Sequence, residues 1–246
     1  MRSVASELTR PAVIGMSGAV ASGKSTLALQ LCEALWPLPG DVVNADGFLF
    51  PNEVLAARGL MGRKGFPETY DVHGMHRFVD QLRGNHPRVV APRYSHESYD
   101  VVPGDEQVIV EARVVVLEGV SVLGAVASRC DVTVYVDADE TDLERWFVDR
   151  FHALRAAART DPRSFYARFA DLPDALAEDL ARHVWAETNL VNLREHVAPQ
   201  RAVADVVLRK GPDHSIHAVE LRARHRAGAP AAPRTTRPTE EETDDG

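Results

Sequence analysis

The chain has 246 residues, of which 45% are hydrophobic and 26% charged, and its formal net charge is −8. This size and composition are typical of one substantial α/β domain with a buried core. The negative charge argues against general nucleic-acid binding, which needs a basic face, and no apolar run is long enough to span a membrane or to serve as a signal peptide. The two cysteines, Cys32 and Cys130, indicate neither a disulfide framework nor a zinc site, so we expect a cytoplasmic protein.

Strand and helix patterns alternate along most of the chain. Apolar runs predict buried strands at residues 12–16, 41–44, 113–118, 132–136 and 204–208, and a last strand at 215–221. Helical spacing of apolar residues predicts helices at 24–35, 51–58, 73–82, 140–157 and 173–193. Residues 60–67 are expected to form an exposed loop, and 89–94 and 99–102 short strands or extended arms. The alternation predicts an α/β fold with a mainly parallel central sheet.

A phosphate-binding loop follows the first predicted strand. The stretch from Gly18 to Ser25 fits the pattern G-x-x-x-x-G-K-[ST] and leads directly into a predicted helix. Backbone N–H groups at such a helix N-terminus bind phosphate oxygens, while the lysine reaches the outer phosphates and the serine hydroxyl ligates Mg²⁺. We therefore expect ATP and Mg²⁺ to bind here. The predicted nucleotide-binding residues are Gly18, Ala19, Val20, Ala21, Ser22, Gly23, Lys24, Ser25 and Thr26.

Two acids close predicted strands at the sheet edge where doubly wound proteins bind ligands. Glu118 ends a fully apolar strand and is a candidate second ligand of Mg²⁺, the alternative being a carboxylate that faces solvent. Asp46 closes the strand expected beside the first one, where it would face the γ-phosphate and accept the proton of the acceptor hydroxyl. The alternative for Asp46 is a turn-forming residue in an Asp-Gly pair.

Further candidates come from the predicted helix at 140–157 and from a polar stretch in mid-chain. Arg145 and Arg150 lie where kinases of this build carry a lid, and an arginine there can stabilise the transferring phosphoryl group. His96 and the flanking Tyr94 and Tyr99 suit a ligand-contacting loop. The alternative for each arginine is a plain surface residue.

Long segments of the chain resemble the bacterial type I pantothenate kinases, in the P-loop kinase group that also holds uridine kinase and phosphoribulokinase. Besides the phosphate loop, the matching segments are Asp46-Gly-Phe-Leu-Phe-Pro-Asn-Glu-Val-Leu, Arg58-Gly-Leu-Met-Gly-Arg-Lys-Gly-Phe-Pro-Glu-Thr-Tyr-Asp71, Ala91-Pro-Arg-Tyr-Ser-His-Glu-Ser-Tyr-Asp100, Leu117-Glu-Gly-Val, Tyr135-Val-Asp-Ala, Asp161-Pro-Arg-Ser-Phe-Tyr, Asn189-Leu-Val-Asn-Leu and Lys210-Gly-Pro-Asp-His214. They cover most of residues 12–222. The resemblance implies a three-layer P-loop kinase domain, which we expect over residues 11–225. Residues 1–10 have no clear pattern and 226–246 are rich in Ala, Pro, Thr and acid without periodicity, so we expect a flexible lead-in and a disordered acidic tail.

The resemblance also implies an activity, namely ATP-dependent phosphorylation of the primary hydroxyl of pantothenate, the first step towards coenzyme A. On matching positions Asp46 is the catalytic base, with Lys24 and Arg150 serving the phosphoryl group, and His214 lies near the nucleotide. The expected pantothenate-binding residues are Asp46, Tyr94, His96, Tyr99, Phe147 and Asn189. Feedback by coenzyme A and a homodimer are further family features.

Two departures from the family pattern keep alternatives open. Phe147 stands where the family has a tyrosine that contacts pantothenate, and the phosphate loop begins at residue 18, where the family carries several dozen preceding residues. The first departure leaves a nucleoside or another hydroxylated small molecule as an alternative acceptor, and the second leaves the dimer open. A third reading is a regulator that binds ATP or coenzyme A without catalysis.

Overall fold

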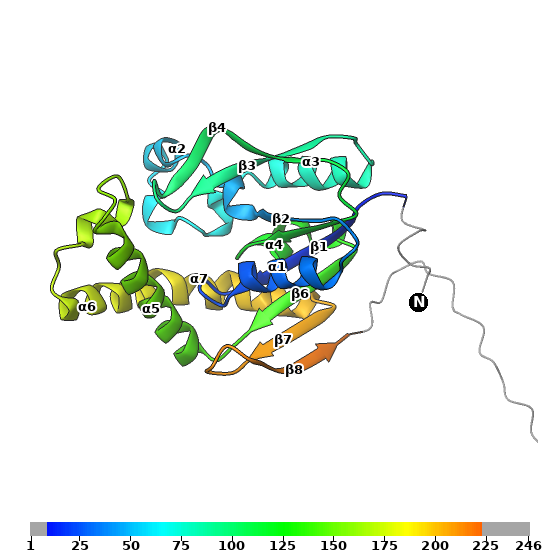
Figure 1. Ribbon diagram of the computed structural model, residues 1–246. Helices are drawn as coiled ribbons and strands as arrows, with labels where there is room; N and C mark the ends of the chain where they lie inside the picture. The colour runs from blue at the N-terminus through cyan, green and yellow to red at the C-terminus, as the bar shows by residue number, and fades with distance from the viewer. Residues whose placement is uncertain (1–8, 223–246) are drawn as a thin grey trace, which may run out of the picture.

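A computed structural model describes residues 9–222 of the chain. Its main sheet has six strands in the order β2-β5-β1-β6-β7-β8, and only β8 runs antiparallel to its neighbour (Figure 1). The strands of this sheet are β1 (Ala12–Gly18), β2 (Gly40–Asn44), β5 (Val114–Glu118), β6 (Val132–Asp137), β7 (Val206–Lys210) and β8 (Ile216–Leu221). The prediction of a mainly parallel central sheet is therefore confirmed.

Helices lie on both faces of this sheet. One face packs against α1 (Lys24–Ala34) through a cluster that contains Met16, Ala28 and Val116. The other face carries the larger core, into which α3 (Val72–Arg83) and α4 (Val122–Val126) pack (Figure 1). Because β1 and β5 are buried on both faces, their sequences are continuous apolar runs rather than alternating ones.

Two smaller units adjoin the main sheet: the first lies beside β2 and α3, and the second lies beyond the carboxyl ends of the parallel strands (Figure 1). The first is an antiparallel ribbon of β3 (Val89–Ser95) and β4 (Asp100–Ile109), accompanied by α2 (Asn52–Ala57). The second is the helix pair α5 (Glu140–Ala158) and α6 (Asp174–Val184), with the connecting residues 159–173 (Figure 1). We refer to the connecting residues 159–173 as the lid loop.

The strand order corrects one expectation. We expected β2 to lie beside β1, whereas β5 lies between them and pairs with both. Asp46 nevertheless reaches the same edge, because Asn44 of β2 is in register with Glu118 of β5 and a 3-10 turn at Ala45–Phe48 follows at once. A β carbon on Gly47 would lie 1.9 Å from the Pro92 carbonyl oxygen. Gly47 is thus required for close packing against β3, beyond any role in the turn.

The predicted helix at 173–193 is also divided in the structure. After α6, π-helical turns at Trp185–Asn189 and Leu193–Val197 flank the short α7 (Leu190–Asn192), and a 3-10 segment, Ala198–Val203, follows. The expected loop at 60–67 contains the 3-10 turn Met61–Arg63, with another at Pro67–Thr69. Residues 1–8 of the expected lead-in lie outside the described part of the chain, and so does the whole of the expected acidic tail at 226–246.

Candidate active site

The phosphate loop joins the carboxyl end of β1 to the N-terminus of α1. Gly23 has φ 81° and caps α1, and a β carbon there would lie 2.7 Å from the Lys210 Nζ. A side chain at position 23 would therefore strain the backbone and displace a buried cation. The Lys210 Nζ donates to the Ser22 carbonyl oxygen at 2.9 Å, so β7 fixes the shape of the loop from outside it.

Lys24 and Glu118 form the charged centre beside the loop. The Lys24 Nζ donates to the Ala19 carbonyl oxygen at 2.7 Å, and burial lowers the pKa of this ammonium group. Glu118 is 3% exposed and accepts a hydrogen bond of 2.8 Å from the Ser25 hydroxyl. Burial raises the pKa of the Glu118 carboxyl, although Lys24 and Ser25 act in the opposite direction.

This donor set fits a magnesium ion. Ser25 and Glu118 present a hydroxyl and a carboxylate oxygen side by side, and hard oxygen ligands of this kind are those that Mg²⁺ takes, together with water and phosphate. Burial is the main cause of the raised pKa of Glu118, and a cation bound beside the carboxylate would lower that pKa again. No cluster of three or more His, Cys, Asp or Glu side chains suited to a metal occurs between residues 9 and 222.

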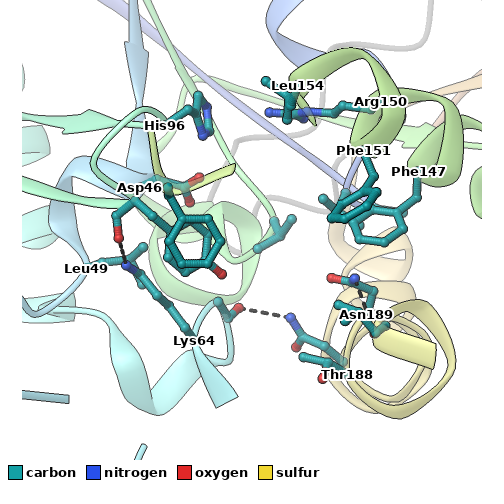
Figure 2. A pocket seen from close by; sticks show the side chains of 18 of the residues that line it. Asp46, Leu49, Lys64, His96, Phe147, Arg150, Phe151, Leu154, Thr188 and Asn189 are labelled. Atoms are coloured by element: carbon teal, nitrogen blue, oxygen red, sulfur yellow. Dashed lines mark hydrogen bonds between the residues drawn. The ribbon is translucent and has the colours of Figure 1, made fainter. Parts of the chain in front are cut away.

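A cavity of about 320 Å³ opens next to Ala19 and Val20 of the phosphate loop (Figure 2). The turn after β2 provides Asp46 and the connection between β3 and β4 provides His96, while α5 provides Arg150 and Phe147. The predicted residues that line it are Asp46, Tyr94, His96, Tyr99, Phe147, Arg150 and Asn189. Segments separated by more than a hundred residues thus meet at one cavity.

Asp46 is oriented by a buried tyrosine. The Tyr70 hydroxyl donates to Asp46 Oδ1 at 2.9 Å, and the Asp46 backbone N–H donates to Asn44 Oδ1 at 2.7 Å. Tyr70 is 4% exposed, and its burial together with the charge of Asp46 raises the pKa of the phenol well above its usual range, so Tyr70 stays a donor. Among residues 9–222, no hydrogen-bond donor contacts the second carboxylate oxygen, Oδ2, so this atom can accept a proton from a ligand.

The two arginines of α5 behave differently. Arg145 donates to the Pro212 carbonyl oxygen and forms an ion pair of 2.9 Å with Asp142, and it does not line the cavity. Arg150 lines the cavity and, within residues 9–222, has no carboxylate at ion-pair distance. Figure 2 shows its side chain extending from α5 towards the side that carries His96 and Asp46. Arg150 is therefore the arginine available to a transferring group.

The wall around His96 is largely aromatic. The ring of Tyr94 lies edge-on to His96 with centroids 5.2 Å apart, and part of the imidazole faces solvent. Partial burial at the cavity wall and the nearby charge of Arg150 lower the pKa of His96, so its neutral form dominates at neutral pH. Burial raises the pKa of Tyr99 to about 12. These side chains therefore present neutral hydrogen-bonding groups to a ligand.

His214 lies apart from the cavity. Its ring stacks on Trp146 with centroids 4.0 Å apart, next to Lys210, whose Nζ is 5.4 Å from the same indole. Through Lys210 this group adjoins the outer side of the phosphate loop at Ser22. A position near the nucleotide is compatible with this placement and stays a prediction.

Several cavity residues were not singled out from the sequence. Lys64 and Tyr70 belong to the long matching segment that ends at Asp71, so their place in a quoted motif was the signal available. The same signal was available for Phe165 and Tyr166, which lie in the matching segment at 161–166, and for Asn192, which lies in the one at 189–193. Phe151 and Phe169 lie outside the quoted segments, and apolar residues there also fit a plain helix core. These missed residues are Lys64, Tyr70, Phe151, Phe165, Tyr166, Phe169 and Asn192.

Comparison with known proteins identifies the family. Residues 13–147 match the Phosphoribulokinase / Uridine kinase family. The pantothenate kinase of Sorangium cellulosum is 47% identical over 225 residues, which are 87% of this chain and 73% of that protein. The pantothenate kinase of Agrobacterium fabrum is 43% identical over 228 residues, or 86% and 71% of the two chains. The chain belongs to the pantothenate kinase family.

Solved structures agree with the fold. A protein from Silicibacter sp. TM1040 that is described as a fructose transport system kinase aligns with a TM-score of 0.63 and 29% identity. The alignment covers 76% of this chain and 85% of that protein. Phosphoribulokinase from Rhodobacter spheroides aligns with a TM-score of 0.51 at 13% identity, over 81% and 70% of the two chains. The second likeness concerns the fold alone. No helix in the part of the chain that the structure describes is long and apolar enough to cross a membrane.

Proposed function

We propose that this protein transfers the γ-phosphoryl group of ATP to the primary hydroxyl of pantothenate. One observation carries the proposal: the cavity that adjoins the phosphate loop contains a carboxylate, Asp46, held by Tyr70 with one oxygen free. Pantothenate is the substrate named for relatives that are 42–47% identical over most of the chain. Phosphoryl transfer needs a phosphate cradle, an acceptor-orienting base and nearby positive charge, and this site offers a candidate for each.

The residues divide the reaction between them. Asp46 Oδ2 accepts the proton of the acceptor hydroxyl while that oxygen forms its bond to the γ-phosphorus and the bond to the bridging oxygen of the leaving ADP breaks. Lys24 and Arg150 balance the negative charge on the transferring group and the leaving phosphates. Ser25 and Glu118 would hold Mg²⁺, which supplies further charge neutralisation when bound.

The acceptor side suits a small hydroxylated molecule with an apolar middle. Aromatic rings from α5 and the lid loop form one wall, while Asn189 and His96 provide polar groups at separate points. Pantothenate has this character, with hydroxyls at one end, a dimethyl-substituted carbon and a carboxylate at the other end. Asn189, Tyr94, His96 and Tyr99 would contact it.

A second acceptor class is favoured by one observation. Phe147 lines the cavity without the hydroxyl that the family has at this position, and it packs 5.8 Å from the ring of Trp185. A different acceptor would explain the change. The candidates are a nucleoside, suggested by the matching Phosphoribulokinase / Uridine kinase family, and a sugar, suggested by the structural neighbour described as a fructose transport system kinase.

An acceptor panel distinguishes these functions. ADP release is measured by a coupled assay with pantothenate, uridine, fructose and simple polyols at equal concentration. Saturable turnover on pantothenate with none on the other compounds supports the proposal. Turnover on uridine or fructose but not on pantothenate would overturn it, and ATP binding without turnover on any acceptor would favour a regulator.

Coenzyme A feedback and a homodimer belong to the same proposal. Coenzyme A would compete with ATP at the phosphate loop. Steady-state kinetics with coenzyme A at several ATP concentrations test for this competition. Light scattering after gel filtration measures the mass of the particle.

A further inference from the structure

Lys64 is a cation inside the aromatic part of the acceptor cavity. Its Nζ lies 4.3 Å from the centroid of the Tyr99 ring and 4.9 Å from that of Tyr94. It donates to Asn52 Oδ1 and to the Tyr99 carbonyl oxygen, each at 2.6 Å. In the part of the chain that the structure describes, no carboxylate lies within ion-pair distance of Lys64. A half-buried charge without an anionic partner is costly to keep, which indicates that its other contacts matter.

The residue that Lys64 contacts has an unusual backbone. Tyr99 has φ 55°, in the left-handed region that bulky side chains rarely adopt. Its carbonyl oxygen accepts two hydrogen bonds, from Lys64 Nζ at 2.6 Å and from Asn52 Nδ2 at 2.9 Å. Such a conformation persists only where surrounding contacts fix it, and strained residues of this kind gather at ligand sites.

Tyr99 in turn joins the ribbon to the lid loop. Its ring stacks on Phe165 with centroids 4.3 Å apart and an interplanar angle of 22°. Beside this contact, the Phe165 backbone N–H donates to the Glu97 carbonyl oxygen at 2.6 Å. These two contacts hold the ribbon wall and the lid wall of the cavity together, since Tyr99 and Phe165 both line it.

We propose that Lys64 is a positioning residue for the acceptor: with Asn52 it holds Tyr99 in its left-handed conformation, and through Tyr99 it holds the lid loop against the ribbon. The inference rests on the proposed function, because it concerns how the same cavity is closed over a hydroxylated substrate. The contact between the Lys64 ammonium group and Tyr99 is also sensitive to the charge of Lys64. A protonated amine donates stronger hydrogen bonds to a carbonyl and interacts with aromatic rings, and a neutral amine loses both advantages.

The charge of Lys64 is lost within an accessible pH range. Burial lowers the pKa of Lys64 to about 8, while Asp100 of β4 and Asp46 of the turn after β2 oppose the shift. The other groups that face the ammonium are the neutral rings of Tyr94 and Tyr99 and the imidazole of His96, whose pKa the charge of Lys64 helps to lower. Lys64 is therefore charged below about pH 8 and neutral above it, and the lid contact weakens as the pH rises through that value.

The test measures lid closure without any substrate. In amide hydrogen exchange, Lys64→Met should speed exchange of peptides covering the Phe165 amide about tenfold or more, and leave those covering α1 unchanged. Asn52→Ala, which removes the second donor to Tyr99, should give a smaller increase, and Lys64→Arg, which keeps the charge, should restore most of the protection. Arg93→Met, which removes an exposed cation of the ribbon paired with Asp105, is the matched control and should change nothing.

The kinetic arm measures the acceptor constant. Lys64→Met should raise the KM for pantothenate about tenfold with the KM for ATP within about twofold. When the pH is raised beyond 8, the wild-type KM for pantothenate should increase, whereas the KM of Lys64→Arg should stay constant up to about pH 9. Unchanged exchange at Phe165 in both Lys64→Met and Asn52→Ala would overturn the inference. Absence of turnover on pantothenate in the wild type would overturn the proposed function alone, because the exchange result does not depend on substrate.

Discussion

The two halves of the site are built in different ways. The half proposed to bind the nucleotide phosphates is one continuous loop, whose backbone groups and Lys24 would contact the phosphates and whose shape Lys210 supports from β7. The half that faces the acceptor is assembled from the turn at Asp46, the ribbon, the lid loop and the segment after α6, and aromatic side chains dominate it. The first half depends on local geometry, whereas the second depends on contacts between distant segments.

This difference has consequences for substrate constants. A change in the phosphate-binding half should alter the KM for ATP and leave the acceptor constant nearly unchanged, while a change in the acceptor half should do the opposite. Asp46 and Arg150 stand where the halves meet, so their variants should lower kcat rather than either KM. Each prediction below tests one part of this division.

The largest loss is expected for Arg150→Ala. An arginine that stabilises a transferring phosphoryl group contributes about 10³–10⁵ in kcat, and Arg150 has no competing ion pair between residues 9 and 222. Arg145→Ala is the matched control on the same helix, since Arg145 is bound to Pro212 and Asp142 outside the cavity. Steady-state ADP release measures both, and equal losses in the two variants would contradict the assignment.

The second largest loss is expected for Asp46→Asn, whose kcat should fall by about 10²–10⁴ because the general base is lost. The amide keeps the size of the side chain and can still accept from Tyr70, so the fold should be preserved. Nucleotide affinity, measured by calorimetry, should stay within about twofold. An Asp46→Asn enzyme with full activity would remove Asp46 from the mechanism.

Lys210→Met should affect the phosphate-binding half alone. Its ammonium group donates to the Ser22 carbonyl oxygen, and a hydrogen bond with a charged partner contributes about 1.5–3 kcal/mol, which corresponds to roughly tenfold to a hundredfold in the KM for ATP. The KM for pantothenate is the internal control. An equal rise in both constants would show that the two halves are not separable.

Phe147→Tyr should have the smallest effect, and it should improve rather than impair the use of pantothenate. A restored hydroxyl that reaches the acceptor would contribute about 0.5–1.5 kcal/mol and lower the KM for pantothenate about twofold to tenfold. The KM for ATP should not change. A higher KM for pantothenate in this variant would indicate that the cavity is shaped for another acceptor.

The same division explains what the sequence could predict. The phosphate loop is contiguous, so its pattern placed Gly23 and Lys24 correctly at the start of a helix that follows a buried strand. The apolar runs likewise predicted the central strands, because strands buried on both faces contain few polar residues. Their order was wrong for β2, since strand adjacency depends on chain crossovers that periodicity does not record.

The acceptor half could be predicted only in part. Asp46, His96 and Asn189 were identified through their motifs, and they line one cavity in the structure. Lys64 was missed although it lies in a matching segment, because its contact is with the backbone of Tyr99, 35 positions away, and the pattern around Lys64 does not indicate that contact. The π-helical turns after α6 also escaped prediction, since a π turn keeps an apolar pattern close to that of an α-helix.

The central claim concerns the acceptor, and a competition experiment tests it most directly. Equimolar pantothenate, uridine and fructose are incubated with the enzyme and limiting ATP, and the phosphate esters are identified by ³¹P NMR and mass spectrometry. We predict a single product, the phosphomonoester on the primary hydroxyl of pantothenate, and its loss in Asp46→Asn. Phosphorylation of uridine or fructose in preference to pantothenate would contradict the account.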